Sequence, residues 1–137
     1  MVSPVGKKKA DVRTTTRDVW TQHMIYLILA MLRDQKGMDE AVGQRRLGWP
    51  LGRALIGSNV LIVGFGALGS ELAVRLQPFG VNMTAVRRSV WQSPPTGAAA
   101  ALHDRAHTDQ LLSLLPAADV VVLTCTMVCT RLSPPGV

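Results

Sequence analysis

The sequence predicts an α/β fold, namely part of a doubly wound parallel sheet with three to four strands, preceded by an apolar helix. Three apolar, β-rich runs indicate the strands, at Val60–Val63, Val81–Val86 and Val120–Leu123. An amphipathic run with helical spacing separates the first two of them. Hydrophobic residues make up 47% of the chain and aromatic residues only 4%, which suits layers of helix and sheet better than a β-sandwich.

A glycine-rich turn joins the first strand to the amphipathic run. It reads G-x-G-x-x-G, with Gly64, Gly66 and Gly69 enclosing Phe65 and the pair Ala67-Leu68. In such a turn the first glycine lets the chain leave the strand sharply, and the second lets a pyrophosphate approach the backbone. The third lets the helix pack closely on the strand, and the helix N-terminus attracts phosphate. The motif therefore predicts a Rossmann-type dinucleotide site, the alternative being glycines that serve tight packing only.

The second strand ends in two arginines, Arg87 and Arg88. A site for NAD is expected to carry Asp or Glu there, which accepts hydrogen bonds from the ribose hydroxyls. Guanidinium groups instead bind a 2′-phosphate through charge-assisted hydrogen bonds. The pair favours NADP, with NAD as the second choice, unless both arginines are simply solvated.

Residues 1–17 are basic and threonine-rich, and we expect them to form a disordered arm without a secretory signal, the alternative being a transit peptide for organelle import. A helix is expected over residues 18–35, with Thr16 or Asp18 as its N-cap. Its central run, Met24–Leu32, is apolar on all sides but too short to span a bilayer, which needs about 20 residues. The run therefore predicts cover by another subunit or by a domain outside this chain.

Charge and cysteine content narrow the function classes. The net charge is +6, which can help to attract an anionic cofactor. The basic residues are scattered without an aromatic stacking platform, so no nucleic-acid partner is expected. Cys125 and Cys129 lie in or beside an apolar strand without nearby metal-ligand partners, which indicates reduced thiols, a cytoplasmic protein and no metal site.

The region between the second and third strands is less regular. Residues 89–101 are expected to form a surface loop, followed by a short edge strand within 102–106 and solvated side chains at His103 and His107. Residues 108–115 predict a short amphipathic helix with Thr108 as its cap. The strand Val120–Leu123 is expected to be buried by its β-branched run yet to have an open edge.

The flanking blocks resemble the D-isomer-specific 2-hydroxyacid dehydrogenase family, of the phosphoglycerate dehydrogenase and hydroxypyruvate reductase kind. The residues that carry the resemblance are the block LIGSNVLIVGFGALG at 55–69, the block RLQPFG at 75–80 and the strand ADVV at 118–121. The resemblance covers Val19 to Met127 and implies that Thr124, Cys125 and Thr126 lie beside the cofactor. Arg87 replaces the family's common Asp, and Thr126 replaces a frequent proline.

The resemblance also implies what this sequence lacks. Residues 128–137 diverge, and the family's catalytic Arg, Glu and His blocks have no matching positions, so no catalytic residue is assigned. We expect a truncated member: a partial NAD(P)-binding domain over residues 18–127, followed by a divergent tail and inactive alone. The alternative is a noncatalytic regulatory partner that pairs with an intact dehydrogenase subunit. In either case Met24–Leu32 is the surface expected to form a homo- or heterodimer.

Overall fold

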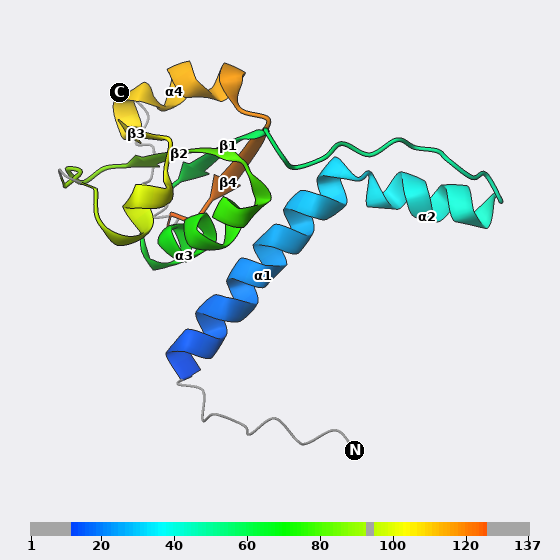
Figure 1. Cartoon of the computed structure of the whole chain (residues 1–137), viewed down its shortest axis with the longest axis horizontal. Helices are drawn as coiled ribbons and strands as arrows, with labels where there is room; N and C mark the ends of the chain where they lie inside the picture. Colours follow the sequence, from blue (N-terminus) through cyan, green and yellow to red (C-terminus); the bar gives the residue numbers. More distant parts are fainter. Residues whose placement is uncertain (1–11, 93–94, 126–137) are drawn as a thin grey trace, which may run out of the picture.

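The computed structural model describes residues 12–92 and 95–125, with side chains from residue 16 onward. Its centre is a parallel sheet with the strand order β3-β2-β1-β4 (Figure 1). The strands are β1 (Asn59–Val63), β2 (Asn82–Arg87), β3 (Asp104–His107) and β4 (Val120–Leu123). The predicted α/β class is confirmed, and the parallel sheet has four strands, where three to four were expected.

The inner strand β1 sets the register of the sheet. Val60 pairs with Met83 of β2 on one side and with Val120 of β4 on the other. All three of these side chains are buried. Because the strands are parallel, the carboxyl ends of β1, β2 and β4 meet at one edge of the sheet, which is where open α/β sheets bind their ligands.

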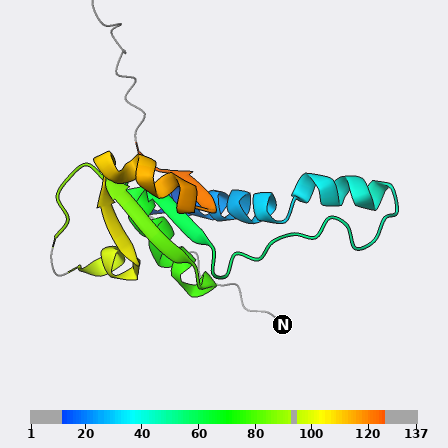
Figure 2. The same cartoon turned by 90° about the horizontal axis from the view of Figure 1, so that it is seen from above.

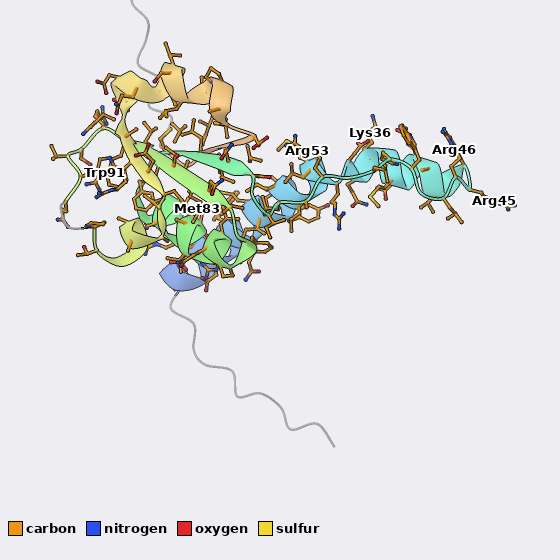
Figure 3. All side chains as sticks on the ribbon, turned by 45° about the horizontal axis from the view of Figure 1, so that its top comes forward. Lys36, Arg45, Arg46, Arg53, Met83 and Trp91 are labelled. Carbon is orange, nitrogen blue, oxygen red and sulfur yellow. The ribbon has the colours of Figure 1, made fainter. Side chains whose placement is uncertain are left out.

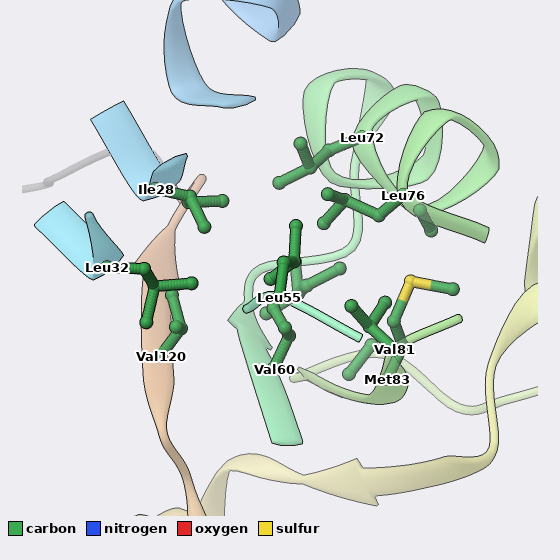
Figure 4. Packing of buried hydrophobic residues seen from close by; sticks show 12 residues of the cluster. Ile28, Leu32, Leu55, Val60, Leu72, Leu76, Val81, Met83 and Val120 are labelled. Atoms are coloured by element: carbon green, nitrogen blue, oxygen red, sulfur yellow. The ribbon is translucent and has the colours of Figure 1, made fainter. Parts of the chain in front are cut away.

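Helices cover the two faces of the sheet unequally. The helices α1 (Val12–Leu32) and α3 (Ala67–Leu76) pack on one face, where Figure 4 shows their side chains meeting those of the strands. The main buried residues of this larger core are Ile28, Leu32, Leu55, Val60, Ile62, Leu72, Leu76, Val81, Met83 and Val120. The other face holds a small core of Leu61, Val63, Val86 and Ala106 under the single turn of α4 (Leu111–Leu114).

The helix α1 begins earlier than the sequence predicted. It starts at Val12, so residues 12–17 are helical rather than part of a disordered arm, and residues 1–11 lie outside the described residues. Neither Thr16 nor Asp18 is therefore the N-cap. The Asp18 carboxylate instead forms an ion pair with Arg75 of α3, with Nη2 and Oδ1 2.6 Å apart. Arg75 also pairs with Glu71, and these contacts fasten the first part of α1 to α3.

Beyond α1 the chain forms an arm. The helix α2 (Gln35–Gly43) and the returning segment 44–58 extend away from the sheet (Figure 2). Figure 3 places Arg45 and Arg46 at the far end of this arm and Trp91 on the opposite side of the molecule. Leu47 and Leu51 on the returning segment are almost fully exposed.

The apolar run of α1 is buried on one side only. Ile28 and Leu32 enter the larger core, whereas Tyr26, Leu27 and Met31 are more than half exposed. The described part of this chain therefore does not cover the outer face of the helix.

The region after β2 differs from the expected surface loop and solvated histidines. Residues Gly97–Ala101 form a 3-10 helix whose end packs against the larger core. The exposed His103 accepts a hydrogen bond at Nδ1 from the backbone N–H of Met83, at 3.2 Å. His107, not Thr108, caps the following helical segment, because its backbone N–H reaches the side chain of Gln110 at 3.1 Å.

The strand β4 is an edge strand, as expected, but it is less buried than its apolar sequence suggested. Val120 is buried, whereas Val121 and Leu123 are 43% and 65% exposed. No helix within residues 12–92 and 95–125 is long and apolar enough to cross a membrane. The same residues contain no group of three side chains that could hold a metal ion.

Candidate functional site

The three motif glycines have different surroundings. Gly64 has φ +98°, and a Cβ there would lie 2.7 Å from the backbone nitrogen of Cys125. A Cβ on Gly69 would lie 2.3 Å from the carbonyl oxygen of Gly64. Among the residues that the structure describes, a Cβ on Gly66 would meet no atom within 4 Å. Glycine at 64 and 69 is therefore required by packing within the protein, while the surface above Gly66 is open.

The loop after β4 packs directly on the glycine turn. The Thr124 hydroxyl donates a hydrogen bond to the carbonyl oxygen of Gly64 at 2.5 Å, and the Thr124 backbone N–H donates to Val63 at 2.9 Å. The backbone N–H of Gly64 in turn donates to Val86 of β2 at 2.8 Å. The carboxyl ends of β1, β2 and β4 are thus joined around Gly64.

The helix α3 begins inside this turn. Gly66 is its N-cap and has no side chain to cap the first turn, which contains Ala67 and Leu68 and no acidic residue. The Ser70 hydroxyl bonds back to the carbonyl oxygen of Gly66 at 2.8 Å and leaves the first N–H groups of the helix uncapped. Such an N-terminus favours a bound anion through its N–H groups and its dipole.

A cavity of about 350 Å³ opens beside Gly66. It lies between the N-terminus of α3, the carboxyl end of β2 and the segment that follows. Its lining consists of Phe65, Gly66, Ser70, Arg87, Trp91, Gln92, Thr96, Ala98 and Ala99. Most of these residues come from the segment that the sequence assigned to a surface loop.

Arg87 and Trp91 form the outer wall of this cavity. The Arg87 guanidinium carbon lies 4.2 Å from the centre of the Trp91 ring, a cation–π distance. The Trp91 ring also contacts Phe65, with centroids 5.3 Å apart, and its Nε1 donates to the carbonyl oxygen of Ala106 at 3.0 Å. Trp91 is therefore fixed from three sides.

The structure brings together most of the residues singled out in the sequence, in two groups. Gly64, Gly69, Thr124 and Cys125 meet where β1 and β4 end, and the exposed Cys125 thiol is a free cysteine. Gly66 and Arg87 share the cavity, whereas Arg88 is exposed and outside its lining. Thr126 lies outside the described residues.

Sequence reasoning missed the cavity wall formed by Phe65, Ser70 and Trp91. Phe65 and Ser70 lie in or beside the motif, but only the glycines carried a recognisable signal. Trp91 could have been noticed, because a large aromatic residue in a proline-containing loop just after a predicted strand needs a packing partner.

Comparison with known proteins identifies this arrangement. Residues 25–130 match the sequence pattern of the D-isomer specific 2-hydroxyacid dehydrogenase, NAD binding domain. The chain belongs to this family. The match spans the glycine turn, the cavity and the loop after β4. Membership of the D-isomer specific 2-hydroxyacid dehydrogenase family therefore supports binding of a nicotinamide dinucleotide at this place.

Individual members of the family agree with this assignment. A glyoxylate/hydroxypyruvate reductase of Arabidopsis thaliana is 39% identical over 107 residues, which cover 74% of this chain and 30% of that protein. A family member of known structure from Aeromonas salmonicida superposes with a TM-score of 0.65 at 23% identity, covering 77% of this chain and 32% of its own. Another, from Xanthobacter autotrophicus in complex with NADPH and MES, superposes with a TM-score of 0.67 at 17% sequence identity. That superposition covers 82% of this chain and 34% of the other. The chain thus spans about a third of the length of these relatives.

Proposed function

We propose that this chain binds NADPH in preference to NADH, as the cofactor-binding part of a D-2-hydroxyacid dehydrogenase that reduces small 2-oxo acids. The observation that carries the proposal is the open surface above Gly66, which continues into a cavity lined by Arg87. The pyrophosphate would lie on the N-terminus of α3 and the adenosine half in the cavity.

The charges around the cavity support NADPH over NADH. The lining includes no carboxylate, and the end of β2 carries the two guanidinium groups of Arg87 and Arg88. A 2′-phosphate on the adenosine ribose would gain charge-assisted hydrogen bonds from a guanidinium at this end of the strand, each worth about 1.5–3 kcal/mol. The substrate class rests on the similarity to the glyoxylate/hydroxypyruvate reductase.

We expect negligible turnover from the 137-residue chain by itself. Hydride transfer to a 2-oxo acid needs a proton donor held close to the cofactor. None of the three histidines, His23, His103 and His107, lines the cavity at Gly66. The three also lie on α1 and at the two ends of β3, apart from the glycine turn.

Titration of the full chain with NADPH and with NADH tests the binding, with intrinsic fluorescence and melting temperature as readouts. We expect both cofactors to raise the melting temperature, with NADPH acting at the lower concentration. Unchanged fluorescence and melting with both cofactors would disprove the proposal. In the same samples, NADPH oxidation with hydroxypyruvate or glyoxylate should not exceed the buffer control.

The outer face of α1 favours a second role, that of a noncatalytic partner which pairs with another dehydrogenase subunit or with a second copy. Tyr26, Leu27 and Met31 are 59%, 51% and 62% exposed, although they belong to one continuous apolar run. An apolar strip of this kind is typical of a protein–protein contact.

Light scattering after size exclusion tests this role. If the chain pairs with a second copy, Met31→Asp should lower the measured mass of the assembly. If it pairs with an intact dehydrogenase subunit, Met31→Asp should reduce the amount of chain that co-elutes with that subunit. Leu112→Asp is the matched control, because Leu112 is 79% exposed on the α4 side of the sheet. A monomeric wild-type chain that captures no intact subunit contradicts the role.

A further inference from the structure

The two arginines at the end of β2 are not equivalent. Arg87 donates from Nε to the carbonyl oxygen of Ser89 at 3.1 Å and from Nη2 to the carbonyl oxygen of Val90. Its guanidinium plane also lies over the ring of Trp91, 4.2 Å from its centre. Two of the five N–H donors of Arg87 are thus committed to backbone carbonyls, and the contact with Trp91 holds the guanidinium against the ring, so Arg87 is oriented by the segment that follows it.

Arg88 is the opposite case. Its side chain is exposed, and no hydrogen bond or ion pair engages it within the described residues. It follows Arg87 directly, outside the cavity lining, at the point where the chain leaves the sheet. Its five N–H donors are therefore available to a dianionic group at the cavity rim.

We propose that Arg87 is a positioning residue that holds Trp91 as a stacking wall for the adenine ring, and that Arg88 alone distinguishes NADPH from NADH. The inference rests on the proposed binding of the dinucleotide at this site and assigns separate roles within it. The cavity adjoins the end of β2, where the adenosine ribose of a dinucleotide lies in this type of fold. The ring that occupies the cavity is therefore adenine rather than nicotinamide.

The contacts of Trp91 suit a fixed stacking surface. Phe65 packs against the ring at 5.3 Å, and the indole N–H is anchored to Ala106 of β3 at 3.0 Å. Arg105 donates to the carbonyl oxygen of the next residue, Gln92, at 3.0 Å. Because the ring is already ordered, little conformational entropy is lost when a purine stacks on it.

Two small probes separate the roles, adenosine 5′-diphosphate and adenosine 2′,5′-diphosphate, which differ in the phosphate on the 2′ oxygen. The titration uses the 137-residue chain with Trp20→Phe and Trp49→Phe, so that Trp91 is the only tryptophan left to report. Arg87→Lys keeps the charge but loses the planar stack and one of the two carbonyl contacts. Arg88→Ala removes the free guanidinium, and Arg46→Lys at the far end of the arm is the control.

We expect Arg87→Lys to weaken both probes alike, by about tenfold, as loss of a base-stacking contact does. Arg88→Ala should weaken only the 2′,5′-diphosphate, also by about tenfold. Trp91→Leu removes the reporting tryptophan, so its binding is measured by calorimetric titration, and it should weaken both probes as Arg87→Lys does. A melting scan confirms that each variant is folded.

Selective loss of the 2′,5′-diphosphate in Arg87→Lys would overturn the division of roles, because Arg87 would then be the phosphate ligand. Equal loss of both probes in Arg88→Ala, or unchanged binding in Arg87→Lys and Trp91→Leu, would also overturn it. A parent chain that binds neither probe nor NADPH and NADH shows instead that the proposed function is wrong, and the inference falls with it.

Discussion

The Asp119 carboxylate joins the starts of two neighbouring strands. Its Oδ2 accepts a hydrogen bond from the backbone N–H of Asn59 at 2.9 Å, and its Oδ1 lies 2.7 Å from the Arg53 guanidinium. Asn59 begins β1 and Asp119 directly precedes β4, so one side chain aligns the edge strand with the central strand. The hydrogen bond from Asn59, together with Arg53, lowers the pKa of Asp119 below its ordinary value.

This contact predicts a loss of stability in acid. Because the folded chain lowers the pKa of Asp119, its contribution is present above the unfolded pKa of about 3.9 and is lost as the pH falls through the folded pKa. Asp119→Asn should therefore lower the melting temperature at pH 7, and the difference from wild type should shrink toward pH 3. Asp109→Asn, on the 3-10 turn Thr108–Gln110, is the control. A difference that is constant across the pH range would contradict this assignment.

Replacing Gly69 should destabilise the fold. Its added Cβ would lie 2.3 Å from the Gly64 carbonyl oxygen, which is backbone, and 2.9 Å from the Thr124 hydroxyl, which is held by its hydrogen bond to Gly64. Gly69→Ala should cost about 1–3 kcal/mol in the free energy of unfolding, measured by urea denaturation. Gly43→Ala in α2 is the matched control, because its Cβ would meet no atom within 4 Å, and it should be neutral or stabilising. Equal costs at the two positions would refute the packing argument.

Replacing Gly66 should weaken dinucleotide binding without destabilising the fold. Its Cβ would contact no protein atom, so Gly66→Ala should unfold at nearly the same urea concentration as wild type. The same Cβ would occupy the surface that the pyrophosphate is proposed to approach. We therefore expect dinucleotide affinity to fall by about tenfold or more, measured by fluorescence titration. Full affinity in a folded Gly66→Ala chain would argue against a phosphate at this position.

The attachment of α1 should depend on Arg75. This residue pairs with Asp18 of α1 and with Glu71 of α3, and its side chain is 29% exposed. Arg75→Met keeps most of the apolar stem and should lower the free energy of unfolding by about 1 kcal/mol. This loss should be smaller at high salt. Lys36→Met is the control, because the Lys36–Glu40 pair on α2 is 4.0 Å apart and both of its side chains are exposed. A larger loss of unfolding free energy in Lys36→Met than in Arg75→Met would show that the ion pairs of Arg75 do not hold α1 on α3.

The sequence by itself determined the central unit of this protein. An apolar strand, three spaced glycines and an amphipathic helix are local patterns, and each allows only a narrow range of backbone conformations. The order of the strands, β3-β2-β1-β4, was not predicted and comes from the structure. Family membership could be inferred from the sequence, since its motifs are contiguous in the chain.

Tertiary structure decided what depends on residues distant in sequence. Asp18 was one of two candidates for a helix N-cap, but its carboxylate pairs with Arg75, 57 positions further along the chain. Arg87 and Arg88 look alike in the sequence, and only the fold shows that one packs on Trp91 while the other is exposed. The exposure of Val121 and Leu123 likewise follows from the place of β4 at the sheet edge. Local patterns report backbone preference, whereas side-chain partners are fixed only when the layers pack together.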